Sequence, residues 1–185
     1  MNRNMNYIPP VAVGGIGGSG TRMVAEILKK IGFYIGTDLN DANDNLWFTL
    51  LFKRTDLLSS ESSQSELAEL VDLFFNAMVY HQPFTKAQQE TIEKLAAKDR
   101  LQHRASWLKQ RAESMQKTIK EPVDANSRWG WKEPNTHIFL DMLEQEISGL
   151  RYIHVIRHGL DMAHSANQNQ LKLWGPLFFL EYIVI

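Results

Sequence analysis

The stretch Val11-Ala-Val-Gly-Gly-Ile-Gly-Gly-Ser-Gly-Thr-Arg22 decides the fold of this chain. A short β-branched run leads into five glycines, and apolar residues at helical spacing follow. This order predicts a strand, a tight loop and a helix from about Gly20 to Ile31. Glycine lets a backbone take positive φ and approach a ligand closely, and the free N–H groups that open a helix favour an anion. The stretch is typical of a phosphate-binding loop; the alternative is a glycine-rich turn without a ligand.

Two phosphate-binding motifs fit this loop. Gly15, Gly17 and Gly20 satisfy the dinucleotide pattern G-x-G-x-x-G, and Asp38 follows at about the distance needed to hold a ribose. Gly15 and Gly20 also have the spacing of the P-loop, G-x-x-x-x-G-K-[ST]. Thr21 and Arg22 stand where that motif has its lysine and hydroxyl residue. The loop alone does not decide between the two motifs.

Composition excludes several classes of protein. The 185 residues suffice for one domain with a proper core, and the net charge of −1 indicates no nucleic-acid partner. The absence of cysteine excludes disulfides and thiolate metal sites, and the histidines show no metal-ligand spacing. No signal peptide and no run long enough to span a bilayer are recognisable. We expect a soluble, cytoplasmic protein without a metal ion.

A long helical region follows the first strand and helix. Phe33–Ile35 is expected to form a short second strand, and residues 37–45 form a polar, turn-rich loop at its carboxyl end. Ligands of open α/β sheets bind at that edge. From Leu46 to about Ile119 the apolar residues recur at three and four positions, which predicts helices. We therefore predict a helical insertion over residues 46–120, between the second and third strands.

The third strand ends in two charged residues. Trp129–Lys132 is predicted as a strand, and Asn135 as the N-cap of a helix over Thr136–Ile147. Lys132 and Glu133 would then lie at a strand end, facing the same edge of the sheet as the glycines. The alternative is an ordinary Lys-Glu pair in a surface loop.

The apolar run Arg151–Ile156 predicts a buried strand, and Arg157 follows it. A P-loop nucleotide hydrolase is expected to carry an acidic residue for Mg²⁺ at the end of such a strand. Arg157 argues against that class. Arg157 and Ser165, eight residues apart, can meet around a phosphate as a guanidinium and a hydroxyl.

Three motifs together resemble the sulfotransferases that use 3′-phosphoadenosine-5′-phosphosulfate (PAPS). Gly18-Ser-Gly-Thr-Arg22 resembles the family's 5′-phosphosulfate loop, and the pair Arg157 and Ser165 resembles its 3′-phosphate motif. Lys132-Glu-Pro134 is similar to the Lys-acid-Pro step of the tyrosylprotein-type enzymes. The motifs occur in the family's order and cover most of residues 11–170.

The resemblance implies an α/β fold with a P-loop-like parallel sheet flanked by helices, as one domain over residues 1–185. It implies a sulfotransferase that moves a sulfuryl group from PAPS to a hydroxyl or amine acceptor, without a metal ion. The donor-binding residues that it implies are Gly17, Gly18, Ser19, Gly20, Thr21, Arg22, Arg157 and Ser165.

The resemblance also implies two catalytic residues. Lys132 would stabilise the leaving group, and Asp38 lies closest to the family's position for the base, with Glu133 and His137 behind it. The acceptor is not identified by the sequence.

The chain departs from the family at two points. Gly18 stands where a cationic residue is usual, so Arg22 or Lys132 would have to neutralise the charge near the sulfuryl group. The family normally continues for many more residues, so we interpret the chain as a truncated or naturally shortened domain. Two other classes remain: a P-loop small-molecule kinase, which Mg²⁺-dependent ATP binding would reveal, and a non-catalytic nucleotide-binding or interaction domain.

Overall fold

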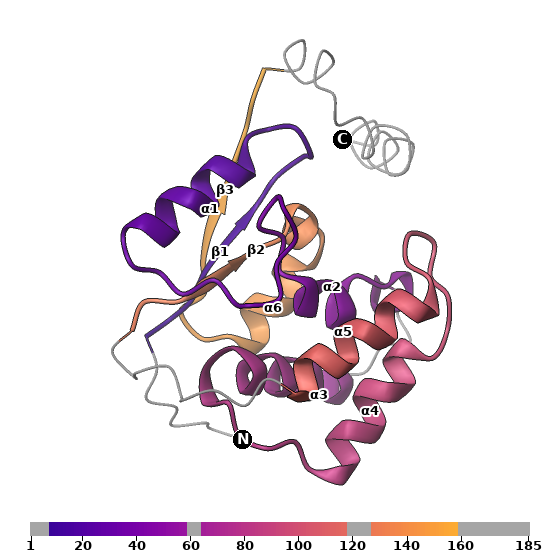
Figure 1. Cartoon of the computed structure of the whole chain (residues 1–185). Coiled ribbons are helices and arrows are strands. Elements are labelled where there is room, and N and C mark those ends of the chain that lie inside the picture. The colour runs from indigo at the N-terminus through magenta and orange to yellow at the C-terminus, as the bar shows by residue number, and fades with distance from the viewer. Residues whose placement is uncertain (1–7, 59–63, 118–126, 159–185) are drawn as a thin grey trace.

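The computed structural model describes residues 8–58, 64–117 and 127–158, and it has an α/β fold around a parallel sheet. The strands are β1 (Val11–Gly14), β2 (Gly130–Lys132) and β3 (Arg151–His154), in the order β2-β1-β3 (Figure 1). Val11 of the central strand pairs with the first residue of both neighbours. All carboxyl ends therefore meet at one edge. No helix in the described ranges is long and apolar enough to cross a membrane.

Helix α1 (Thr21–Lys30) covers one face of the sheet. Alternate side chains of β1 point to this face because a strand has a side-chain period of two. They pack with the inner side of α1 in a buried cluster of Val11, Val13, Ala25, Leu28 and Ile35. The predicted helix is confirmed to within one residue at each end, and glycines with positive φ flank it, Gly20 at 105° and Gly32 at 87°.

A layer of helices covers the other face (Figure 1). Trp131 of β2 packs there against Phe48 and Phe74, with ring centroids 5.8 Å and 5.3 Å apart. Ala12 of β1 belongs to the same large core. The elements of this layer are α2 (Leu46–Phe52), η1 (Thr55–Leu58), α3 (Gln64–Phe75), η2 (Asn76–Tyr80), α4 (Lys86–Ala96), α5 (Ala105–Lys117), η3 (Pro134–Phe139) and α6 (Leu140–Glu146).

The predicted second strand is reduced to one isolated bridge, between Tyr34 and Trp129. Two hydrogen bonds flank it, from Tyr34 N to Arg128 O and from Gly130 N to Tyr34 O. Pairing ends there because Gly36, with φ of 101°, turns the chain. The predicted helical region is confirmed over the described parts of 46–117. In the described sheet these helices lie between β1 and β2 in the chain, because the predicted second strand is only a bridge.

The predicted N-cap at Asn135 is wrong. The helical segment begins earlier, at Pro134, with the Glu133 side chain accepting a hydrogen bond from Asn135 N at 2.6 Å. Proline is favoured in the first helical position because its missing N–H would have no partner there. The segment starts as η3 and becomes α-helical only at Leu140.

The prediction that Arg151–Ile156 is a buried strand is also wrong for the described residues. β3 ends at His154, and its side chains are exposed or half-buried. It has one neighbour, β1, in the described sheet. Hydrophobic residues in a run indicate a strand, but what covers each face depends on tertiary neighbours.

Candidate functional site

The glycine loop, residues 15–20, lies between β1 and α1 at the carboxyl edge of the sheet. Its first residue is held from one side by a hydrogen bond from Gly15 N to Pro134 O, 2.9 Å long. On the other side, Val155 N donates to Gly14 O, also at 2.9 Å. Gly15 has φ of 145°, and a Cβ there would collide with the Val155 carbonyl oxygen. Glycine is required here because neighbouring backbone approaches too closely for any side chain.

The loop ends at a set of hydrogen-bonding groups that face its turn into α1. Ser19 is buried, and within the described chain its Oγ has no hydrogen-bond partner. Gly20 is the N-cap of α1 and provides no side-chain cap, and Thr21 is buried in the first turn. The opening N–H groups of a ten-residue helix, together with its dipole, favour an anion at this point. Arg22 is exposed one residue further on.

Arg157 reaches the glycine loop from the segment after β3. Its Nη1 donates a 3.3 Å hydrogen bond to the carbonyl oxygen of Gly18, and its side chain is exposed. The structure therefore brings two of the predicted donor-binding residues together, although 139 positions separate them in the sequence. Ser165, the expected partner of Arg157, lies outside the described residues.

Lys132 lies at the carboxyl end of β2, as predicted. Its ammonium pairs with the Asp44 carboxylate and donates to Ala42 O at 3.1 Å, with the side chain 3% exposed. Both partners belong to the polar loop, residues 37–45. These contacts join Lys132 to the polar loop rather than to the glycine loop. Lys132 pairs in register with Val13, so its side chain leaves the sheet on the α1 face.

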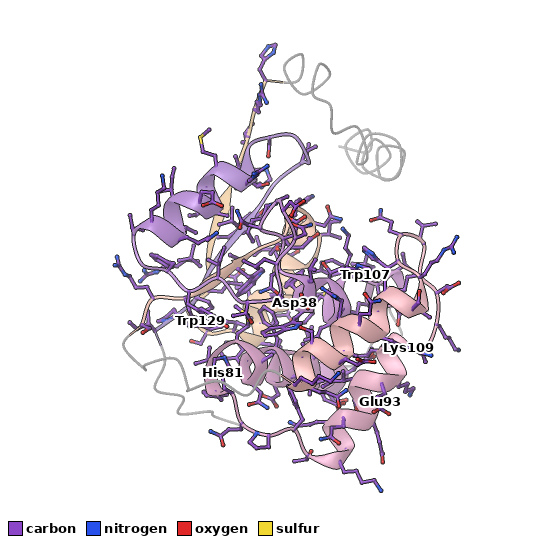
Figure 2. The ribbon with its side chains drawn as sticks, viewed as in Figure 1. Asp38, His81, Glu93, Trp107, Lys109 and Trp129 are labelled. Atoms are coloured by element: carbon purple, nitrogen blue, oxygen red, sulfur yellow. The ribbon has the colours of Figure 1, made fainter. Side chains whose placement is uncertain are left out.

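Asp38 binds a cation from α5. Its Oδ1 lies 2.7 Å from Arg111 Nη1, and within the described chain its buried Oδ2 has no hydrogen-bond partner. The Arg111 guanidinium lies over the Trp107 ring, 5.5 Å from its centroid. Figure 2 shows Asp38 in the space between the sheet and α5. Asp38 thus connects the polar loop to the helical layer.

Glu133 is almost completely buried, at 2% exposure. One carboxylate oxygen lies 3.1 Å from Lys53 Nζ, just after α2, and the other accepts the Asn135 N–H. Burial raises the pKa of the Glu133 carboxyl, and the positive charge of Lys53 opposes that rise. A buried carboxyl with a perturbed pKa beside a cavity is a candidate functional group.

A small cavity of about 220 Å³ lies beside Glu133. Two of its lining residues are His103 and Trp107, whose rings stack with centroids 4.5 Å apart and planes at 19°. Burial, with the charges of Lys53 and Arg100, lowers the pKa of His103 to about 4, so the ring is neutral at pH 7. The lining residues are Asn40, Asp44, Leu46, Thr49, Lys53, His103, Trp107 and Glu133.

Sequence reasoning missed most of this cavity. Lys53, His103 and Trp107 carry no motif and lie far apart in the sequence, and only packing of the helical layer brings them to the end of β2. The one available signal was Glu133 itself, beside Lys132 at a strand end. A second cavity of about 590 Å³ lies among α3, α4 and the end of α2, and it shares Lys53 and His103 with the small cavity.

Comparisons of the chain with family models, with curated proteins and with solved structures found no match. The described residues include no group of three or more His, Asp or Glu side chains placed to hold a metal ion. The glycine loop and Arg157 present N–H groups, a hydroxyl and a guanidinium to an anion. The small cavity presents a carboxylate next to space for a small polar molecule.

Proposed function

We propose that this protein is a PAPS-dependent sulfotransferase whose donor binds at the glycine loop. The observation that carries the proposal is the loop itself. It follows the central strand, opens α1, and contains the buried Ser19 hydroxyl, which has no hydrogen-bond partner among the residues that the structure describes. Arg157 contacts the same loop with a guanidinium that suits a second phosphate. The acceptor is a hydroxyl or an amine.

In the proposed reaction the acceptor attacks the sulfur in line with the bond to the 5′-phosphate. Negative charge builds on the bridging oxygen as that bond breaks, so fixed cations and N–H groups near the oxygen stabilise the transition state. The N–H groups of the glycine loop and the Lys132 ammonium are proposed for this role. Lys132 would exchange its Asp44 contact for the leaving group.

Isothermal titration calorimetry on the full chain tests the proposal. Adenosine 3′,5′-bisphosphate is expected to bind more tightly than AMP, and to do so without a metal ion. Equal affinities for the two nucleotides would show that Arg157 and Ser165 do not bind a 3′-phosphate. A preference for ATP with Mg²⁺ would indicate a small-molecule kinase instead, and nucleotide binding with no transfer to any acceptor would indicate a binding domain.

The Lys132→Ala variant separates an enzyme from a binding domain. Leaving-group charge develops only in the transition state, so the variant is expected to lose sulfuryl transfer while it keeps most of its affinity for the bisphosphate. Because Lys132→Ala leaves the Asp44 carboxylate without its lysine partner, the double variant with Asp44→Asn is the control for folding. Transfer is measured with radiolabelled PAPS. Normal turnover would contradict the assignment and make Arg22 the candidate.

A further inference from the structure

The backbone of Glu133 and Pro134 contacts the end of β1 and the first residue of the glycine loop. Glu133 N donates to Val13 O at 3.1 Å, and the next carbonyl, that of Pro134, accepts from Gly15 N. Lys132 leaves the sheet on the α1 face, and successive strand side chains alternate. The Glu133 carboxyl therefore extends to the opposite face, where the helical layer and the small cavity lie. Two consecutive residues, Glu133 and Pro134, therefore connect the start of the loop to the wall of the cavity.

The charges around the small cavity are balanced. Each of its two carboxylates already has a lysine partner: Glu133 pairs with Lys53, and Asp44 pairs with Lys132. The remaining lining groups are an imidazole that is neutral at pH 7, an amide, a hydroxyl and apolar side chains. Among the described residues, an ammonium or an anion would find no unpaired counter-ion there. The volume, about 220 Å³, is below the range of about 300–1,000 Å³ usual for pockets of drug-sized ligands, so the cavity suits a small uncharged group.

We propose that the small cavity receives an uncharged hydroxyl acceptor and that Glu133 is the base that takes its proton. This inference rests on the proposed function. The acceptor oxygen bonds to the sulfur, and the bond from sulfur to the 5′-phosphate oxygen breaks with its electron pair left on that oxygen. The hydroxyl proton passes to the Glu133 carboxylate and then to water. The products are a sulfate monoester and adenosine 3′,5′-bisphosphate.

The geometry favours Glu133 over Asp38 for this role. Both are buried or largely buried carboxylates paired with one cation, but Asp38 is not among the residues that line the cavity. Burial makes Glu133 a better proton acceptor by raising its pKa, while Lys53 favours the ionised form needed before reaction. Substituting Glu133 and Asp38 one at a time therefore compares the two candidate bases directly.

The test uses full-length protein, radiolabelled PAPS and two probe acceptors, benzyl alcohol and 4-nitrophenol. Glu133→Gln is expected to bind adenosine 3′,5′-bisphosphate within about threefold of wild type. Its transfer to benzyl alcohol should fall by about 100-fold or more, the usual range for a lost general base. Transfer to 4-nitrophenol should fall much less, because that hydroxyl loses its proton readily. Glu66→Gln is the control, since Glu66 on α3 also pairs with one cation, the partly buried Arg54.

Several outcomes would overturn the inference. An equal loss with both acceptors would mean that Glu133 is only structural. A greater loss of transfer to benzyl alcohol in Asp38→Asn than in Glu133→Gln would identify Asp38 as the base. Wild-type protein that binds the bisphosphate but transfers to neither probe, or prefers benzylamine to benzyl alcohol, would exclude a hydroxyl acceptor in the cavity. Wild-type protein that does not bind the bisphosphate would instead overturn the proposed function itself.

A separate double variant tests whether Glu133→Gln loses transfer only because it fails to fold. If Glu133→Gln is unstable, the double variant with Lys53→Met removes both members of the buried pair and leaves no charge without a partner. The double variant should fold and still show the selective loss with benzyl alcohol. A folded double variant with wild-type transfer to benzyl alcohol would contradict the inference.

Discussion

The two faces of the sheet are packed very differently. On the α1 face the buried cluster has five members, and α1 leaves Met23 and Ile27 exposed at 70% and 51%. On the other face the helical layer buries the large aromatic side chains of the chain's main core, among them Trp131 and Phe48. Hydrophobic stabilisation grows with buried apolar area. Most of the folding free energy therefore comes from the face away from α1, while the glycine loop lies at the carboxyl edge of the sheet.

Trp131→Ala should have the largest effect on stability. It removes a fully buried indole from between Phe48 and Phe74, so the free energy of unfolding should fall by about 3–5 kcal/mol. Leu28→Ala on the α1 face should cost only about 2 kcal/mol, the low end for such a truncation. Urea unfolding followed by fluorescence measures both. Equal losses would show that the α1 face contributes as much as the helical layer.

Arg157→Ala should affect binding and not folding. Loss of a charged hydrogen-bond donor should weaken binding of adenosine 3′,5′-bisphosphate by about 1.5–3 kcal/mol. Because its side chain is exposed, the free energy of unfolding should change by less than about 0.5 kcal/mol. Arg151→Ala, at an exposed arginine that begins β3, is the control. An unfolded Arg157→Ala protein, with normal affinity per folded molecule, would make Arg157 structural.

Gly15→Ala tests whether close backbone approach shapes the loop. The added Cβ would meet the Val155 carbonyl at a backbone angle that only glycine adopts easily, costing on the order of 1–3 kcal/mol of stability. At Gly20, φ is also positive, but an added Cβ has nothing within 4 Å. Gly20→Ala should therefore be less destabilising in thermal unfolding. If Gly20→Ala is the more destabilising variant, the requirement for glycine in this loop comes from the positive φ and not from close backbone contact.

Acidification should weaken the helical layer through His103. Its pKa is lowered from 6.5 to about 4 in the folded protein, so between these values the unfolded chain binds a proton that the folded chain does not. The free energy of unfolding should be unaffected by this group above about pH 6.5 and should fall as the pH drops towards 4. His103→Gln should reduce that dependence, and His154→Gln, at an exposed site on β3, is the control. Denaturation at pH 7 and pH 5 measures the difference; an unchanged slope in His103→Gln would contradict the assignment.

The sequence by itself determined the features that depend on residues close together along the chain. The strand, glycine loop and helix over residues 11–31 could be predicted because β-branched runs, positive-φ glycines and helical spacing act locally. The end of β2 at Lys132 and the helical character of the described parts of 46–117 could be predicted for the same reason.

Tertiary structure decided which side chains meet. Asp38 and Arg111 are 73 positions apart, and Lys132 and Asp44 are 88 apart, so no local pattern indicates either pair. Glu133 became a cap and a cavity wall because Pro134 starts a helical turn and because α2 brings Lys53 to the carboxylate. The exposure of β3 likewise depends on what lies against each of its faces. Burial and ion pairing are properties of the packed layers, and the candidate acceptor cavity exists only through them.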